Sequence, residues 1–417
     1  MSSTFSNALS GLNANSLAID TVSGNLANLN TTGYMNNQVS FEDLLSGVSN
    51  AANSSVAGSV VAQTSTQFSQ GAIQTTGQPF DAAIQGKGFF VLSNPSSGQV
   101  TFSREGDFTV NSAGQLLGPG GADVQGWNAV NGVLSTSGAT SNITLPISGS
   151  QQPIATQNFT VSANLNSDAT VGAANASFSS PIQVYDAQGT AHTLTISYTE
   201  TAPNTWTYNI TIPSSDLAGG TGATTSLATG TLTFDGTGTL ISPAATAGPI
   251  AIPVTGLADG ASDMSLNWNL FNSAGTPTIT QYAESSANLA STQDGTAPGQ
   301  LTGTSIGANG QISATYSNGT SVVVAQLALA SVLNPDSMQN LGNNTFAVTA
   351  ATATPIIGTS GTGSRGDITG GALESSTVNI ATEFTNLLTY ERGYQANSKV
   401  ITTEDDIMQS TVSLIQG

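Results

Sequence analysis

The carboxyl-terminal stretch NIATEFTNLLTYERGYQANSKVITTEDDIMQSTVSL, residues 379–414, decides the fold. Steps of four and three residues through it land mostly on apolar side chains, a spacing averaging about 3.5 residues that is typical of a helix packed along another helix. Asn379 suits the N-cap of this helix, and Glu383 places a negative charge in its first turn. The apolar positions of this carboxyl-terminal seam are Ile380, Phe384, Leu387, Tyr394, Ile401, Met408, Val412 and Ile415.

The amino-terminal residues supply a second helix with the same rhythm. Apolar residues again recur at steps of four and three, and the pattern should end near Asn30, before Thr31, Thr32 and Gly33. Because isolated helices are marginal in water, these two must bury their seams against neighbours, so we predict a coiled-coil-like core and self-assembly. The positions of this amino-terminal seam are Phe5, Leu9, Leu12, Ile19 and Leu26.

Between the helices the sequence predicts β-structure. FFVL at 89–92 and VQGW at 124–127 are short runs bounded by Gly, Asn and Pro. Two longer runs, IQVYDAQGTAHTLTISY at 182–198 and ATYSNGTSVVVAQLALA at 314–330, predict antiparallel hairpins around Gly-containing turns. The predicted fold class is a multidomain α+β protein, in which terminal helices form the core unit and antiparallel all-β domains are nested outside it.

Changes of composition divide the chain into parts. Residues 46–70 are rich in Ser, Ala, Asn and Gly and carry no charge, so they are interpreted as a connector that is extended or pairs weakly as a strand. Short strands follow, and charges become still rarer from about 150 to 284. The predicted parts are a terminal helical core domain of 1–45 with 368–417, a connector of 46–77, a shared β domain of 78–150 with 285–367, and an inserted outer β domain of 151–284.

Composition limits the partners of the chain. Its 417 residues carry a net charge of −19, with five Lys and Arg in total and no basic cluster, which argues against nucleic acid and anionic lipid. The longest apolar stretch, Val322 to Leu333, is too short to span a bilayer, so no membrane insertion is expected. The first Lys or Arg is Lys87, so a positively charged leader is missing, and export without a cleaved signal peptide is expected.

No motif predicts catalysis. GTSIG at 303–307 matches the nucleophile elbow, but that site needs a downstream histidine, and the single histidine, His192, lies upstream. GTGSRG at 361–366 is interpreted as part of a flexible connector. His192 is expected at the surface, and Asp186, Asp235 and Asp294 are expected to be turn residues, with a weak calcium site left open. We therefore predict no enzyme, no catalytic residues, no cofactor and no metal site.

The terminal stretches resemble those of bacterial flagellar axial proteins, the family of rod, hook and hook-associated subunits. ALSGLNANSLAIDTVSGNLANLNTTGYMNNQVSFEDLL at 8–45 carries the N-x-A-N ending and the T-x-G-Y turn of that family. ERGYQAN at 391–397 resembles the core of its carboxyl-terminal helix, and GQPFDAAIQGKGFFVL at 77–92 resembles its β domain. The hairpin at 182–198 with NTWTY at 204–208 is similar to the extra outer domain of hook subunits.

This resemblance implies a structural subunit of the flagellar hook, located outside the cell in the hook and basal body. Subunits would leave through the flagellar type III export apparatus, add beneath the hook cap and form a flexible helical tube that acts as a universal joint. By the same resemblance the tube would join the distal rod protein to the hook–filament junction protein. Two alternatives stay open: a distal rod or other axial protein, or a secreted β-rich adhesin, which would need a secretion signal and a surface anchor.

Overall fold

The structure, a computed structural model, describes residues 3–45, 58–130 and 132–416. The described chain divides into two compact units, one of residues 1–147, 303–315 and 321–417 and the other of residues 148–302 and 316–320. The two predicted helices are confirmed as α1 (Ser3–Ala27) and α2 (Ile380–Gln416). Neither described helix is long and apolar enough to cross a membrane.

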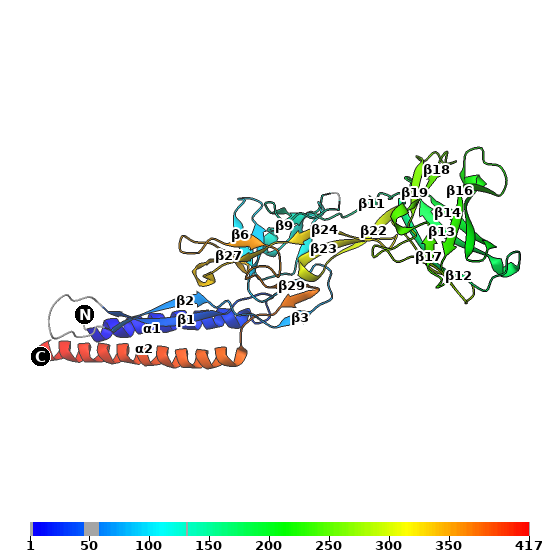
Figure 1. The fold of residues 1–417 in the computed structure, drawn as a ribbon. Helices are drawn as coiled ribbons and strands as arrows, with labels where there is room; N and C mark the ends of the chain where they lie inside the picture. The colour runs from blue at the N-terminus through cyan, green and yellow to red at the C-terminus, as the bar shows by residue number, and fades with distance from the viewer. Residues whose placement is uncertain (1–2, 46–57, 131, 417) are drawn as a thin grey trace. The chain divides into compact units, whose positions relative to one another are not determined.

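Helices α1 and α2 lie side by side in the first unit and run in opposite directions (Figure 1). The predicted N-cap of α2 is confirmed, because the Asn379 side chain accepts hydrogen bonds from the amides of Ala381 and Thr382 at 3.0 and 3.2 Å. Thus the fold class predicted from the ends of the chain, terminal helices in contact plus β-rich domains, is confirmed.

A β-hairpin covers α1. Strand β1 (Asn37–Leu45) pairs antiparallel with β2 (Gly58–Thr66), and the Val60 amide of β2 donates to the Ser10 hydroxyl of α1 at 3.3 Å. Of the predicted connector, residues 46–57 lie outside the described residues, whereas 58–66 form this strand. Of residues 60–66, Val61, Gln63 and Thr64 are exposed and the others are half-buried, so the sequence carried little apolar signal for the strand.

The β-structure of the first unit is built around β5 (Phe89–Ser93), which confirms the strand predicted from FFVL. Phe90 and Leu92 point into one buried cluster, whereas Phe89 and Val91 point into another on the opposite face. A strand buried on both faces has no polar side to present, which explains the unbroken apolar run. The other strands of this unit are β3 (Ile73–Thr75), β4 (Ala82–Gln85), β6 (Val100–Ser103), β7 (Thr109–Val110), β8 (Leu116–Leu117), β9 (Asp123–Asn128), β10 (Ser141–Asn142), β23 (Gln311–Tyr316), β24 (Ser321–Leu327), β25 (Leu329–Ser331), β26 (Gln339–Gly342), β27 (Thr345–Ala347), β28 (Ile356–Gly358), β29 (Asp367–Gly370) and β30 (Ala372–Glu374), while β22 (Gly299–Ile306) belongs in part to each unit.

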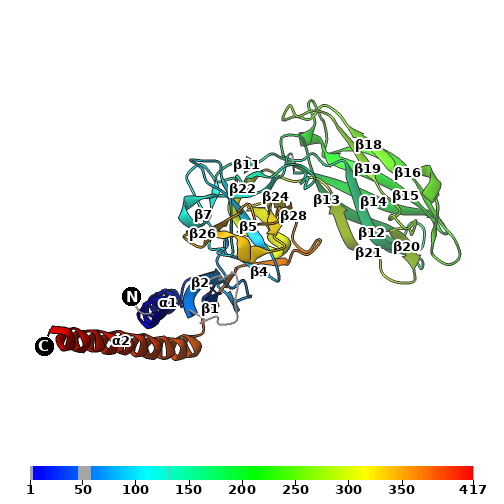
Figure 2. The same cartoon turned by 90° about the vertical axis from the view of Figure 1, so that its left-hand side faces the viewer.

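The second unit contains two five-stranded sheets that share one core (Figure 2). Trp268 of one sheet meets Tyr208 of the other edge to face, with ring centroids 5.2 Å apart. The predicted hairpin at 182–198 is confirmed, but β12 pairs in parallel with β19 and β20, so the unit is not wholly antiparallel. Its strands are β11 (Ser150–Gln151), β12 (Asn158–Asn166), β13 (Ser177–Tyr185), β14 (Ala191–Ala202), β15 (Thr205–Pro213), β16 (Thr224–Phe234), β17 (Leu240–Ser242), β18 (Ile250–Val254), β19 (Met264–Trp268), β20 (Ile279–Tyr282) and β21 (Ala287–Gln293).

Two expectations about local structure are wrong. The segment at 361–366 is not a loose connector: the Gly361 amide donates to the Gly366 carbonyl at 3.0 Å, and β29 follows at once, paired with β4. His192 is not at the surface but buried. It shares the inward face of β14 with Leu194 and Ile196, because residues two apart in a strand point to the same side.

Candidate assembly surface

The seam residues of α2 lie mostly in the open. Phe384 is 51% exposed, and Ile380, Tyr394, Met408 and Val412 are similarly accessible. Leu387 and Ile401 are half-buried, and the side chain of Ile415 lies outside the described residues. In α1, Leu9 is exposed, whereas Phe5, Leu12, Ile19 and Leu26 are half-buried. The exposed residues of the predicted α2 seam therefore do not lie on the face by which the two helices of one chain meet.

Small and amide residues form the helix–helix contact instead. A Cβ placed on Gly11 would lie 2.9 Å from the Asn397 side chain, and one on Gly393 would lie 2.5 Å from Asn15. Each asparagine caps a carbonyl of its own helix: Asn15 Nδ2 donates to Gly11 at 2.7 Å and Asn397 Nδ2 to Gly393 at 3.0 Å. Two Gly-x-x-x-Asn segments thus interlock head to tail, with each glycine leaving room for the partner's asparagine.

The position of the seams follows from helix geometry. A straight α-helix has 3.6 residues per turn, so a strict 3.5-residue repeat drifts around it by about 20° in each heptad. The early seam residues Ile380 and Phe384 consequently lie to the side of the contact, whereas Ile401 has drifted toward α1. Three apolar residues of α2 spaced four apart, Ile380, Phe384 and Leu388, form an exposed stripe along the helix. Leu388 is 58% exposed.

A buried amide joins the helices to the hairpin. Asn25, only 1% exposed, donates to the Asn37 carbonyl at 2.7 Å and to Glu383 Oε2 of α2 at 3.2 Å. Its Oδ1 accepts hydrogen bonds from the Asn37 amide at 3.0 Å and the Tyr34 hydroxyl at 3.2 Å. Burial raises the pKa of Tyr34, although hydrogen bonds from Asn37 and Asn28 work in the opposite direction. We call Asn25, Tyr34, Asn37 and Glu383 the amide hub.

The turn after the hub ties the helices to the β-structure of the same unit. Gly33 has φ +65°, and its amide donates to the Glu374 carbonyl at 2.8 Å. The Glu374 carboxylate is itself fully buried, where it meets Arg104 at 3.1 Å and accepts the Gly71 amide at 2.7 Å. Burial raises the pKa of Glu374, and Arg104 opposes this shift. Glu374 and Gly33 thereby fix where the segments leading to α1 and α2 leave the β-structure.

Replacing Gly33 by Ala should be costly for two separate reasons. The backbone at Gly33 is left-handed, a conformation that costs a residue with a Cβ about 1–2 kcal/mol. The added Cβ would also lie 2.6 Å from the Glu105 amide nitrogen, a backbone atom that cannot move freely. We expect Gly33→Ala to lower the free energy of unfolding by about 2–5 kcal/mol. Gly77, with φ +71° and nothing within 4 Å of the added atom, is the matched control in urea unfolding. Equal losses in the two variants would show that the close approach to Glu105 is unimportant.

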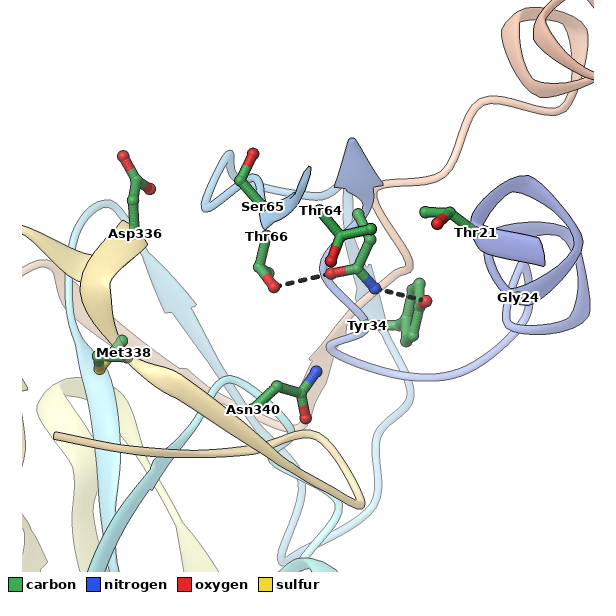
Figure 3. Close-up of a pocket in the computed structure, with 10 residues that line it drawn as sticks. Thr21, Gly24, Tyr34, Thr64, Ser65, Thr66, Asp336, Met338 and Asn340 are labelled. Atoms are coloured by element: carbon green, nitrogen blue, oxygen red, sulfur yellow. Dashed lines mark hydrogen bonds between the residues drawn. The ribbon is translucent and has the colours of Figure 1, made fainter. Parts of the chain in front are cut away.

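A polar groove of about 420 Å³ lies beside the hub (Figure 3). Asn37 of the groove wall donates to the Tyr34 hydroxyl at 3.1 Å and accepts from the Thr66 hydroxyl at 2.7 Å. Its described lining offers hydroxyls, amides and the Asp336 carboxylate, without a histidine or a lysine to act as a base. These groups suit hydrogen bonding rather than acid–base chemistry. The lining residues are Thr21, Gly24, Tyr34, Asn37, Thr64, Ser65, Thr66, Asp336, Met338 and Asn340.

Sequence reasoning overlooked the residues that support the surface. The interlocking glycines had a sequence signal, because the Gly-x-x-x-Asn spacing occurs in both terminal helices, at 11–15 and at 393–397, although it also occurs at 24–28. Glu383 was interpreted through the helix dipole, but its burial against Asn25 depends on a residue of the other helix. In the second unit, Asp186, His192 and Asp259 converge closely enough to hold a metal ion, which the spacing along the chain did not indicate.

Comparison with known families matches four parts of the chain. Residues 5–34 match the family described as flagella basal body rod protein, and residues 83–168 match the flagellar hook protein FlgE/F/G D1 domain. Residues 160–296 match the flagellar basal body protein FlaE D2 domain, and residues 369–414 match the flagellar basal body rod FlgEFG protein C-terminal family.

Several relatives are similar from end to end. The chain is 34% identical to flagellar hook protein FlgE of Treponema pallidum, over 99% of both chains. It is 31% identical to FlgE of Escherichia coli and 32% identical to FlgE of Salmonella typhimurium, in both cases over 98% of this chain and 99% of the relative. A crystal structure of Helicobacter pylori flagellar hook protein FlgE2 covers 71% of this chain and 99% of its own, with a TM-score of 0.54 at 15% identity, a likeness of fold.

Proposed function

The chain belongs to the flagellar hook protein family as a structural subunit of the hook, and from this premise we propose how it polymerises. Copies join through the apolar seams of their terminal helices into a flexible helical tube outside the cell. The tube bends while it passes torque from the rod to the filament. The observation that carries this proposal is the exposed stripe of α2, formed by Ile380, Phe384 and Leu388, on a helix that meets α1 through other residues, Gly393 and Asn397.

The energetics favour a partner for this stripe. Burying a large apolar side chain yields about 1.5–3 kcal/mol, and contiguous exposed apolar residues on a soluble protein mark interaction sites. The remaining exposed seam residues, Tyr394, Met408 and Val412, extend the apolar surface along α2. A neighbouring copy offers the complementary amino-terminal seam, of which Leu9 is exposed. Repeated from copy to copy, such a contact builds a polymer rather than a closed dimer.

The domain division and the further partners belong to the same proposal. Residues 151–284 would act as an outer domain, since the unit that contains them has its own buried core. The tube ends would contact the distal rod protein and the hook–filament junction protein, with growth beneath the hook cap. Subunits would be delivered by the flagellar type III export apparatus.

Polymerisation of the purified chain tests this proposal. We expect sedimentation and negative-stain electron microscopy to show curved tubes above a threshold concentration, with sheared tubes acting as seeds. A chain truncated before Ile380 should stay monomeric, and a chain lacking residues 151–284 should still form tubes. Polymerisation of the truncated chain would refute the role of the carboxyl-terminal seam, and failure of the folded deletion chain would refute the domain division.

A further inference from the structure

His192 lies at the centre of a carboxylate cluster in the second unit. Asp186 comes from the turn between β13 and β14, Asp216 from the short 3-10 helix η3 (Ser214–Asp216), and Asp259 from the turn after β18. The side chains of His192 and Asp186 are 5% and 0% exposed. Four segments therefore bring one imidazole and three acids together in a largely buried place, and such groups are stable there only when their charges are compensated.

Each acid near Nε2 has one oxygen occupied and one turned inward. Asp186 Oδ1 accepts the Gln188 and Thr190 amides at 2.8 and 2.9 Å, and Asp259 Oδ1 accepts the Ala261 amide at 3.0 Å. The remaining oxygens, Asp186 Oδ2 and Asp259 Oδ2, lie 3.3 and 3.8 Å from His192 Nε2. Asp186 Oδ2 and Asp259 Oδ2 thus both face the imidazole.

The other ring nitrogen determines what Nε2 can offer. His192 Nδ1 is 3.0 Å from Asp216 Oδ2, an ordinary hydrogen-bond distance. Because the Asp216 carboxylate can only accept, Nδ1 carries a proton and donates it, so that Nε2 has a lone pair whenever the ring is neutral. Nε2, Asp186 Oδ2 and Asp259 Oδ2 therefore converge as three acceptors. A positive charge among them, either a metal ion or a second proton on the imidazole, compensates the carboxylates.

We infer that Asp186 Oδ2, His192 Nε2 and Asp259 Oδ2 form a binding site for a divalent transition metal of the zinc type, with Asp216 as the residue that orients the imidazole. The three ligand atoms lie within 4.8 Å of one another. Zinc bonds of about 2.0–2.1 Å in tetrahedral geometry place neighbouring ligand atoms about 3.3 Å apart. His192 Nε2 lies 3.3 Å from Asp186 Oδ2 and 3.8 Å from Asp259 Oδ2, so Asp259 would move inward on binding. A bound proton fits less well, because a charge-assisted N–H···O bond is about 2.7–2.9 Å long.

The donor set also selects among metals. Imidazole nitrogen suits zinc and its neighbours, whereas calcium and magnesium favour all-oxygen sites. A carboxylate behind the histidine, the place of Asp216, is the usual support for a metal-bound imidazole. The Asp259 side chain is 26% exposed, so the site opens to solvent on that side for metal entry and for a water as fourth ligand. This site is independent of the helices and of the polymerisation proposed above.

Metal binding to the full-length chain, freed of metal by a chelator, tests the inference. We expect equilibrium dialysis with zinc to give one ion per chain, and the thermal midpoint of the second unit to rise with zinc but not with calcium or magnesium. Asp259→Asn, on the exposed side, and His192→Gln should each abolish the rise. Asp216→Asn should weaken zinc binding by about 10–100-fold.

The chain contains a matched control. Asp235 Oδ1 accepts the Thr237 and Thr239 amides at 2.9 Å, the same turn geometry as Asp186, but has no histidine partner, so Asp235→Asn should leave zinc binding unchanged. Circular dichroism confirms that each variant is folded. If the parent chain binds no zinc, or if Asp259→Asn binds it as tightly as the parent, the site does not exist. In that case His192 is an imidazolium shared among the three acids, and proton NMR would show it titrating alone.

Discussion

Replacing Phe384 by Asp should abolish polymerisation while the isolated chain stays folded. Phe384 is 51% exposed at the middle of the stripe that Ile380 and Leu388 complete, so the monomer does not need it. In the polymer a carboxylate at this position would be buried in an apolar interface without a partner, at several kcal/mol per subunit. Because a helical polymer repeats its contact in every copy, we expect the critical concentration to rise at least about 100-fold, the equivalent of about 2.7 kcal/mol. Sedimentation of parent and variant measures this shift.

The choice of Phe384 over Leu387 follows from the packing. Leu387 is half-buried beside α1, so Leu387→Asp would weaken the helix pair and the polymer together. Thr389 is the matched control: it is exposed on another side of α2, and its hydroxyl bonds only to the Thr385 carbonyl of the same helix, at 2.8 Å. Thr389→Asp should polymerise nearly as the parent does. If Phe384→Asp assembles as well as Thr389→Asp, the polymer is not held by this stripe.

Local signals made the elements predictable from sequence. Apolar residues at steps of four and three predicted both helices, and Asn379 predicted where α2 begins. Gly-containing turns predicted the hairpins of the β units. These features depend on residues close together in the chain, where capping, periodicity and turn chemistry act directly. The resemblance of the two ends to flagellar axial proteins then supplied the function.

Contacts between distant residues were not predictable in this way. The same four-three rhythm did not reveal which side of α2 faces α1, because that choice rests on Gly393 giving room to Asn15. A glycine within a helix costs about 1 kcal/mol relative to alanine, so in sequence it looked like a defect. His192 was misplaced for a related reason: its burial is compensated by acids from three other segments, and their convergence leaves no trace in local spacing.

Replacing Asn25 by Leu should have the largest effect on the free chain. The leucine has similar volume but leaves the Asn37 amide, the Tyr34 hydroxyl and the Glu383 carboxylate without their partner. A buried polar group that loses its hydrogen bond costs about 1–3 kcal/mol, and more when it is charged. We expect a loss of roughly 3–5 kcal/mol in the stability of the helix pair. Amide exchange of the monomer should show α1 and α2 losing protection, while the second unit keeps its own.

Two further variants distinguish the loss of the amide hub's hydrogen bonds from a change in the helix propensity of α1. Asn13, exposed on the same helix, is the control, and Asn13→Leu should leave exchange unchanged. Adding Glu383→Gln to Asn25→Leu removes the buried charge, so the double variant should recover part of the lost protection, as expected when both partners of a buried pair are made less polar. Additive losses from the two substitutions would mean that Asn25 and Glu383 act independently. The N-x-A-N ending would then serve α1 alone, and the link between the two ends of the chain would have to lie in the Gly-x-x-x-Asn contact.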